Sequence, residues 1–221
     1  MPRKDVEFKT SDGLTLRGWF FGPQSSSGKT PCLVMAHGWS ALKEMDLDAF
    51  AEHFTSKLSV SCLVYDNRCF GASEGQPRHE IIPFLQQSDY SDAITYAQSL
   101  EEVDADKIGI WGSSYSGGHV LAVGAVDRRV KAVLSQVVEL LRANDPSAHI
   151  ARIAPTPLLM TVAAQDILTP TDLALEAYSR AREPKQINIL SGAGHFDGYT
   201  GKWFDTNAGC QTEFLKKWLC S

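Results

Sequence analysis

The sequence lacks any apolar run that approaches the length needed to span a bilayer. The residues after Met1 lead straight into polar sequence without the apolar core of a secretory signal. We therefore expect a soluble, cytoplasmic protein with no membrane partner. A stripe of basic residues is also missing, since 21 Lys and Arg stand against 26 Asp and Glu for a net charge of −5. Because nothing in that distribution would neutralise a row of phosphates, we expect no nucleic-acid partner.

Cysteine is scarce and follows no pattern. The five cysteines form no C-x-x-C pair, are odd in number, and two of them fall within apparent strands. We expect reduced thiols and no disulfide framework. Three histidines, His53, His79 and His119, have no spacing typical of metal ligands. The sequence therefore predicts neither a metal site nor a cofactor.

The length and composition of the chain are sufficient for one large hydrophobic core. The chain has 221 residues, of which 43% are hydrophobic and 21% charged, with no internal repeat. We expect residues 1–221 to form a single domain. Alternating polar and apolar residues on either side of the turn at Asp12-Gly13 predict an N-terminal hairpin.

Continuous apolar runs then alternate with segments of helical periodicity. The runs predict buried strands over 32–36, 60–65, 107–111, 130–134, 158–162 and 187–190. The periodic segments predict helices over 43–57, 84–100 (with Ser88 or Ser91 near its start), 115–126, 171–182, and from Thr206 or Asn207 to Leu219. This alternation predicts an α/β fold with a mostly parallel, eight-stranded sheet and helices on both faces.

One strand-to-helix junction stands out. The segment 108–118 passes from an apolar run through Gly112-x-Ser114-x-Ser116 and back into apolar sequence. This resembles the G-x-S-x-G nucleophile elbow, with serine in place of the second glycine, in which the central serine stands at the start of a helix. The alternative is an ordinary small-residue loop between strand and helix.

Two further loops follow predicted strands, and the carboxyl ends of parallel strands meet at one edge of a sheet. These two loops carry Asp166 and His195, respectively. A serine nucleophile needs a base, and the base needs an acceptor that orients it, so Ser114, His195 and Asp166 supply the three roles of a catalytic triad. Taken singly, Asp166 is also a candidate helix cap and His195 a candidate turn residue.

Acyl transfer also needs N–H donors for the oxyanion. The backbone N–H of Tyr115 is one candidate, and that of Trp39 is the other, with Gly38 allowing the turn. His37 is interpreted as a structural hydrogen-bonding residue because His195 already fills the position of the base.

These motifs together resemble the α/β-hydrolase superfamily over nearly the whole chain. The segments 67–75 and 111–119 look like its branch of dienelactone-hydrolase-like and Xaa-Pro-dipeptidyl-peptidase-like proteins, which includes hydrolases and acyl transferases of fungal polyketide clusters. The resemblance implies that Ser114, Asp166 and His195 are nucleophile, acid and base. Dienelactone hydrolases proper use cysteine, so Ser114 favours ester or thioester substrates. A serine at position 114 also argues against epoxide opening and halide displacement, for which other members of the superfamily use aspartate at the elbow.

Many relatives carry a cap domain where this chain has only residues 135–157, so we expect a minimal or absent cap. The pocket should then be open or completed by a partner subunit, which makes a homodimer an expectation. Glu139 and Asp145 are alternative positions for the acid. The residues expected to border the pocket are Phe70, Glu139, His149 and Phe196, with Trp39, Tyr115 and Tyr199 as further aromatic candidates.

The sequence thus predicts a serine hydrolase that cleaves an ester, thioester or lactone of a small, apolar or polyketide-like molecule. Two alternatives stay open. One is an acyl transferase or lyase-type enzyme that uses the same three residues. The other is a ligand-binding protein that keeps the fold without catalysis.

Overall fold

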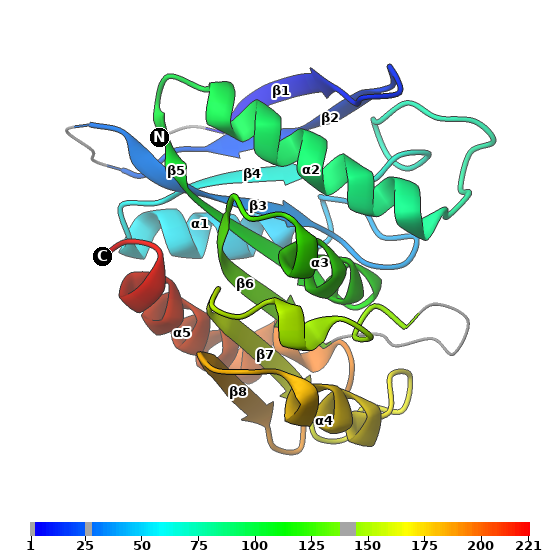
Figure 1. Ribbon diagram of the computed structural model, residues 1–221, viewed down its shortest axis with the longest axis vertical. Helices are drawn as coiled ribbons and strands as arrows, with labels where there is room; N and C mark the ends of the chain where they lie inside the picture. The colour runs from blue at the N-terminus through cyan, green and yellow to red at the C-terminus, as the bar shows by residue number, and fades with distance from the viewer. Residues whose placement is uncertain (1–2, 25–27, 138–144) are drawn as a thin grey trace.

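A single sheet of eight strands organises the described part of the chain. The computed structural model describes residues 3–24, 28–137 and 145–221 (Figure 1). The strands are β1 (Lys4–Lys9), β2 (Thr15–Phe21), β3 (Thr30–Ala36), β4 (Ser61–Tyr65), β5 (Val103–Ser113), β6 (Val130–Gln136), β7 (Leu158–Ala163) and β8 (Lys185–Leu190). Their order across the sheet is β1-β2-β4-β3-β5-β6-β7-β8. β1 and β2 form the predicted antiparallel hairpin, β2 is antiparallel to β4, and the rest are parallel.

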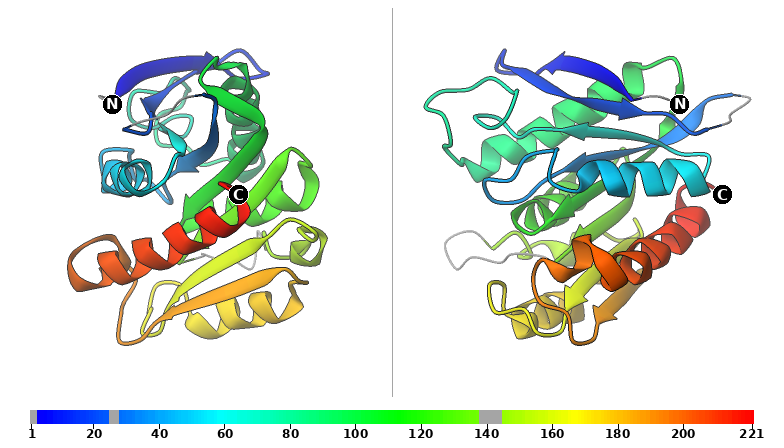
Figure 2. Two further views of the ribbon diagram at one scale, coloured as in Figure 1. Left: turned by 90° about the vertical axis from the view of Figure 1, so that its left-hand side faces the viewer. Right: turned by 180° about the vertical axis from the view of Figure 1, so that it is seen from behind.

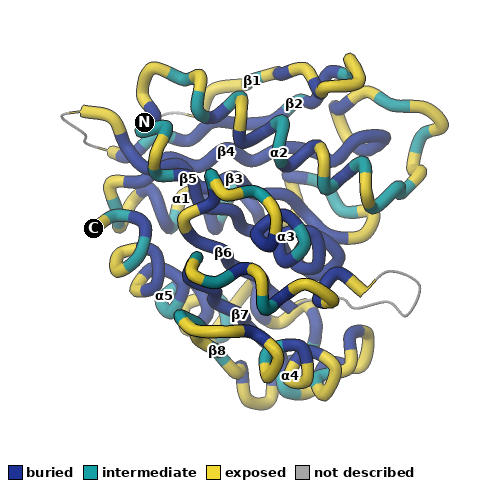
Figure 3. Tube along the Cα trace, in the orientation of Figure 1, coloured by how far each residue is buried: buried dark blue, intermediate teal, exposed yellow. Residues whose placement is uncertain are grey.

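Helices cover both faces of the sheet, as the sequence predicts. α1 (Leu47–Lys57) and α5 (Gly201–Trp218) lie on one face, and α2 (Pro83–Ser99), α3 (Tyr115–Val126) and α4 (Thr171–Arg180) on the other (Figure 2). Each face has its own apolar cluster, with Phe50, Trp111 and Leu215 in one and Tyr90 and Val120 in the other. The central strands are therefore buried on both sides (Figure 3), which explains their unbroken apolar sequences.

The predicted helix over 43–57 starts later, at Leu47. The backbone N–H of Lys43 donates to Asp66 Oδ1 at 2.9 Å and its Nζ to Oδ2 at 2.7 Å. Asp46 then has a φ of 67°, outside the helical region. The preceding residues are thus held in a loop by a buried ion pair that the apolar periodicity could not show.

Two other predicted helix starts are wrong. α2 begins at Pro83, ahead of both Ser88 and Ser91. Proline suits the first turn of a helix because its φ is already helical, and because N–H groups in that turn have no acceptor within the helix, so the lack of an N–H costs nothing there. α5 begins at Gly201, before Thr206 and Asn207. Asn207 is fully buried and uses its side chain inside the molecule, where its Nδ2 donates to Gln136 Oε1 at 2.9 Å.

The six parallel strands β3, β4, β5, β6, β7 and β8 end at the same edge of the sheet. The loops that follow β3, β5, β7 and β8 begin at His37, Ser114, Ala164 and Ser191, respectively. The fold therefore gathers the residues that the sequence singles out along one edge.

At the junction between β5 and α3 the backbone passes very close to itself. A methyl group added to Gly112 would lie 2.1 Å from the carbonyl oxygen of Ser116. We predict that Gly112→Ala lowers the free energy of unfolding by about 2 kcal/mol, because backbone atoms must shift to admit it. Urea unfolding checks this.

Gly209 in α5 is the matched control, since a methyl group there would meet nothing within 4 Å. Gly209→Ala should raise the free energy of unfolding by about 0.5–1 kcal/mol, as alanine does in a helix interior. Equal effects of the two substitutions would contradict the packing argument.

Candidate active site

Ser114 occupies the turn between β5 and α3 in a strained conformation. Its φ is 51° and its ψ −119°, which a non-glycine residue rarely adopts. Its N–H donates to the carbonyl of Gln136 at 2.8 Å, so the turn is anchored to the end of β6. The small residues Gly112 and Ser116 allow the chain to double back at this point. The geometry is that of a nucleophile elbow.

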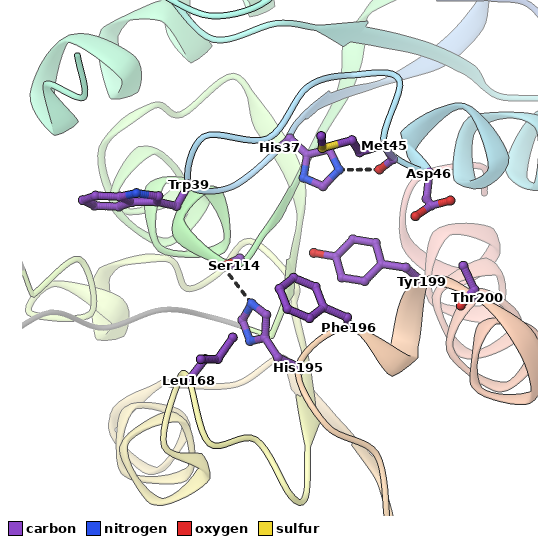
Figure 4. Close-up of a pocket in the computed structure, with 10 residues that line it drawn as sticks. All are labelled: His37, Trp39, Met45, Asp46, Ser114, Leu168, His195, Phe196, Tyr199 and Thr200. Carbon is purple, nitrogen blue, oxygen red and sulfur yellow. Dashed lines mark hydrogen bonds between the residues drawn. The ribbon is translucent and has the colours of Figure 1, made fainter. Parts of the chain in front are cut away.

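The side chains of Ser114, His195 and Asp166 form one hydrogen-bonded row. His195 Nε2 lies 3.1 Å from Ser114 Oγ, and His195 Nδ1 lies 2.8 Å from Asp166 Oδ2 (Figure 4 shows the Ser114–His195 contact). An ionised carboxylate can only accept, so Nδ1–H donates to Asp166 and Nε2 is left to accept the proton of Ser114. Three residues far apart in the sequence thus meet as predicted, in the order that proton transfer requires.

Asp166 is held as a carboxylate by donors from its own loop. Oδ1 accepts the N–H groups of Leu168 and Thr169, both at 2.9 Å, and Oδ2 accepts the hydroxyl of Thr169 at 2.6 Å. Burial raises the pKa of Asp166, but the hydrogen bonds from Thr169 and His195 outweigh it, so the pKa of Asp166 lies below its ordinary value. Pro170 occupies the N-cap of α4, so Asp166 is not its cap.

The sequence also offered Asp145 and Glu139 as positions for the acid. Asp145 accepts the hydroxyl of Ser147 at 2.5 Å and lies 3.9 Å from Arg180, so its carboxylate is engaged elsewhere. Glu139 lies outside the described residues.

Ser116 makes a hydrogen bond that the elbow motif did not predict. Its hydroxyl donates to the carbonyl oxygen of His37, which also accepts Nδ2–H of Asn67 at 2.8 Å. The His37 ring bonds through Nε2 to the carbonyl of Met45 and stacks on Tyr199 at 5.8 Å, the structural role expected for it. Burial lowers the pKa of His37, and a neutral ring can donate from Nε2. Ser116 thus ties the elbow to the loop that follows β3.

That loop lies directly against the elbow at Gly38. A methyl group on Gly38 would stand 2.7 Å from Ser114 Cβ and 3.0 Å from Tyr115 N. The ring of Trp39 packs edge-on against that of Tyr115 at 5.1 Å. The two segments expected to supply N–H donors for an oxyanion are therefore in contact beside Ser114.

A cavity of about 720 Å³ opens at Ser114 (Figure 4). It is lined by His37, Trp39, Met45, Asp46, Ser114, Leu168, His195, Phe196, Tyr199 and Thr200. Phe196, predicted to border the pocket, is among these residues, and so are Trp39 and Tyr199. The volume of the cavity falls within the range of about 300–1,000 Å³ that is typical of small-molecule sites.

Other predicted pocket residues lie elsewhere. Phe70 is not among the lining residues. It belongs to the loop after β4, where its side chain is buried and its ring packs against that of His79. His149 is exposed next to the short 3₁₀ turn Ile150–Arg152 and is not among them either. The Tyr115 ring is buried between Trp39 and His119. The cavity residues that the sequence reasoning missed are Met45, Asp46, Leu168 and Thr200, which follow no motif.

Four apolar side chains that line this cavity are also exposed. Trp39, Met45, Leu168 and Phe196 are each at least half exposed. We call these four residues the apolar rim. Single exposed apolar residues are ordinary, but four around one opening indicate a surface that meets an apolar ligand or partner.

Within residues 3–24, 28–137 and 145–221, no group of three or more His, Cys, Asp or Glu is arranged to hold a metal ion. Across the same residues, no helix has both the length and the apolar character to cross a membrane. The thiols of all five cysteines are free.

An elbow serine after the central strand, with acid and histidine on later loops, defines an α/β-hydrolase. The chain belongs to the X-Pro dipeptidyl-peptidase family (S15), whose sequence profile matches residues 12–149, well over half of the chain. The expected branch of the superfamily is thereby confirmed.

Two fungal proteins illustrate the similarity. A polyketide transferase of a Penicillium species, grgF, is 28% identical over 290 aligned positions that take in 98% of this chain and 97% of the relative. A thiohydrolase of Aspergillus aculeatus, aneE, is 37% identical over 211 positions, 92% of this chain and 64% of the relative. Among solved structures, the α/β hydrolase GrgF from Penicillium superposes with a TM-score of 0.92 at 26% identity, covering both chains fully. The chain is thus an α/β-hydrolase-type protein whose relatives include hydrolases and acyl transferases.

This chain is shorter than such relatives. The 290 aligned positions with grgF exceed its 221 residues, so dozens of residues of that relative have no counterpart here. Several others are matched over only 42% of their length, so the chain spans less than half of them. The reduced cap over 135–157 is consistent with this difference and stays a prediction.

The hydroxyl of Thr169 offers a test of how the acid is held. In Thr169→Val, Asp166 Oδ2 loses a donor, so the charged form is less favoured and its pKa should rise by about one unit. Carbon NMR titration of the aspartate carboxyl groups measures the shift.

Thr169→Ser keeps the hydroxyl and is the matched control, so its Asp166 pKa should stay close to that of the parent protein. A valine variant that titrates like the serine variant would show that the Thr169 hydroxyl does not stabilise the carboxylate.

Proposed function

We propose that this protein is a serine hydrolase of the esterase or thioesterase type, acting through an acyl-enzyme on Ser114. The observation that carries the proposal is the hydrogen-bonded row from Ser114 through His195 to Asp166, open to a cavity. The relatives named thiohydrolases support the reaction class.

In the proposed reaction, His195 Nε2 removes the proton of Ser114 as Oγ attacks the carbonyl carbon of the substrate. The imidazolium that forms is stabilised by the carboxylate of Asp166. His195 then gives its proton to the leaving alcohol or thiol. A water, deprotonated by the same nitrogen, attacks the acyl-enzyme, and Ser114 recovers its proton as the acid leaves. These steps need no metal or organic cofactor.

The oxyanion would be held by the backbone N–H groups of Tyr115 and Trp39. The contact between Gly38 and the elbow supports this arrangement, since both donors belong to segments that touch beside Ser114. The strained turn at Ser114 and the Ser116–His37 hydrogen bond would keep these donors in place before substrate arrives. Fixed donors of this kind are worth about 3 kcal/mol each in the transition state.

For the substrate, we propose a small apolar or polyketide-like ester, thioester or lactone. The cavity walls are largely apolar, and relatives include polyketide transferases. We further propose that the protein works in the cytoplasm, and that a second copy covers the apolar rim.

Acyl transfer is the second candidate, favoured by the relatives named transferases and by the exposure of the rim. A transferase passes the acyl group from Ser114 to an alcohol or amine in place of water. Adding a primary alcohol to the reaction separates the two candidates. A transferase forms the new ester at the expense of the free acid, whereas a hydrolase releases the acid at an unchanged rate.

Labelling with a fluorophosphonate tests the nucleophile itself. The parent protein should react at one site, Ser114, and release acid from aryl esters or acyl thioesters. Ser114→Ala and His195→Ala should lose labelling and at least about 10⁴-fold in kcat, as expected when a triad member is removed.

His53→Gln is the control, because His53 lies on α1 and does not line the cavity. It should label normally. A parent protein that is folded but does not react with the probe would leave ligand binding without catalysis as the remaining function.

A further inference from the structure

The cavity at Ser114 has two chemically different ends. Ser114 and His195 lie at one side, and Asp46 and Thr200 lie at the other, with Phe196 and Tyr199 between them (Figure 4). The surface between these ends is mainly aromatic and aliphatic. An elongated molecule whose carbonyl carbon is at Ser114 would therefore cross an apolar stretch and reach a polar one.

The polar end carries an acceptor that the protein leaves unused. Asp46 is the N-cap residue of α1, but its carboxylate makes no capping hydrogen bond, and within the described residues no other hydrogen bond or ion pair involves it. The hydroxyl of Thr200 likewise does not cap α5. Neither lysine nor arginine is among the lining residues. A half-buried carboxylate with no donor from the protein must take its donors from water or from a ligand.

The position of this carboxylate is set by the loop after β3. The carbonyl of Met45 is bound by the His37 ring, and the next residue, Asp46, takes the left-handed conformation with a φ of 67°. That conformation is unfavourable for most residues and is tolerated best by Gly, Asn and Asp. Such strain persists where the surrounding structure holds it, and it is common at ligand-binding sites.

We propose that Asp46 determines which acyl group the cavity accepts, by receiving a hydrogen bond from a hydroxyl at the far end of the acyl chain. The same charge disfavours an acyl chain that ends in a carboxylate. The inference rests on the proposed function, and it adds the substrate class of that site: hydroxylated acyl esters or thioesters in preference to plain or acidic ones.

The test compares three sets of aryl esters that differ only at the end of the acyl chain: methyl, hydroxyl and carboxylate, each over a range of chain lengths. At the best length, the parent protein should prefer the hydroxyl over the methyl by about tenfold in kcat/KM, as expected for one hydrogen bond to a charged acceptor. The carboxylate series should be the poorest.

Asp46→Asn is the informative variant, because asparagine accepts the left-handed conformation and has nearly the same shape. It should reduce the preference for the hydroxyl several-fold and raise kcat/KM for the carboxylate series by about tenfold, while the methyl series changes little. Asp48→Asn is the matched control, since it removes the same charge two residues away, from a side chain that does not line the cavity. It should leave all three series unchanged.

The outcomes separate the two proposals. If the methyl esters are hydrolysed but the ranking of the three series is flat, or is the same in Asp46→Asn, the role of Asp46 is overturned and the hydrolase stands. Thermal unfolding of each variant confirms that it is folded. If a folded parent protein turns over none of the esters, the proposed function fails.

Discussion

The backbone turn at Ser114 is the constraint on which the site depends. A serine with a φ of 51° is held there because Gly112 lets the chain pass within contact of Ser116 and because the Ser114 N–H is bound by Gln136. The side chain of Ser114 is thereby aimed at the edge of the sheet where the loops after β3, β7 and β8 meet. Strain of this kind costs about 1–3 kcal/mol, which the buried sheet on either side must offset.

Around that turn, buried polar contacts hold each loop. Asp66 joins the loop after β3 to the loop after β4 through Lys43, and Arg68 in that second loop binds Asp89 of α2 at 2.6 Å. Both pairs are almost fully buried, where losing one partner is expensive because the other charge is left alone. The loops at the site are therefore fixed by charge as well as by apolar packing.

Much of this arrangement could be predicted from the sequence, because apolar runs and helical periodicity report burial directly. The eight strands, the elbow at Ser114 and the meeting of Asp166 with His195 follow from that pattern and from the rule for parallel strands. The start of α1, the Ser116–His37 bond and the cavity position of Asp46 did not. Each depends on a contact between distant segments or on a backbone angle, and neither leaves a periodic trace in the sequence.

The apolar rim bears on what would follow the proposed acylation of Ser114. An acyl group bound to Ser114 would sit beneath an opening bordered by Trp39 and Phe196, both more than half exposed. Competing acceptors would then reach the ester bond through that opening. Which acceptor attacks the acyl-enzyme would then depend on the local concentration of each one. An apolar alcohol or amine that binds to those rings would be concentrated there, and would compete with water in spite of the far higher concentration of water in bulk solution.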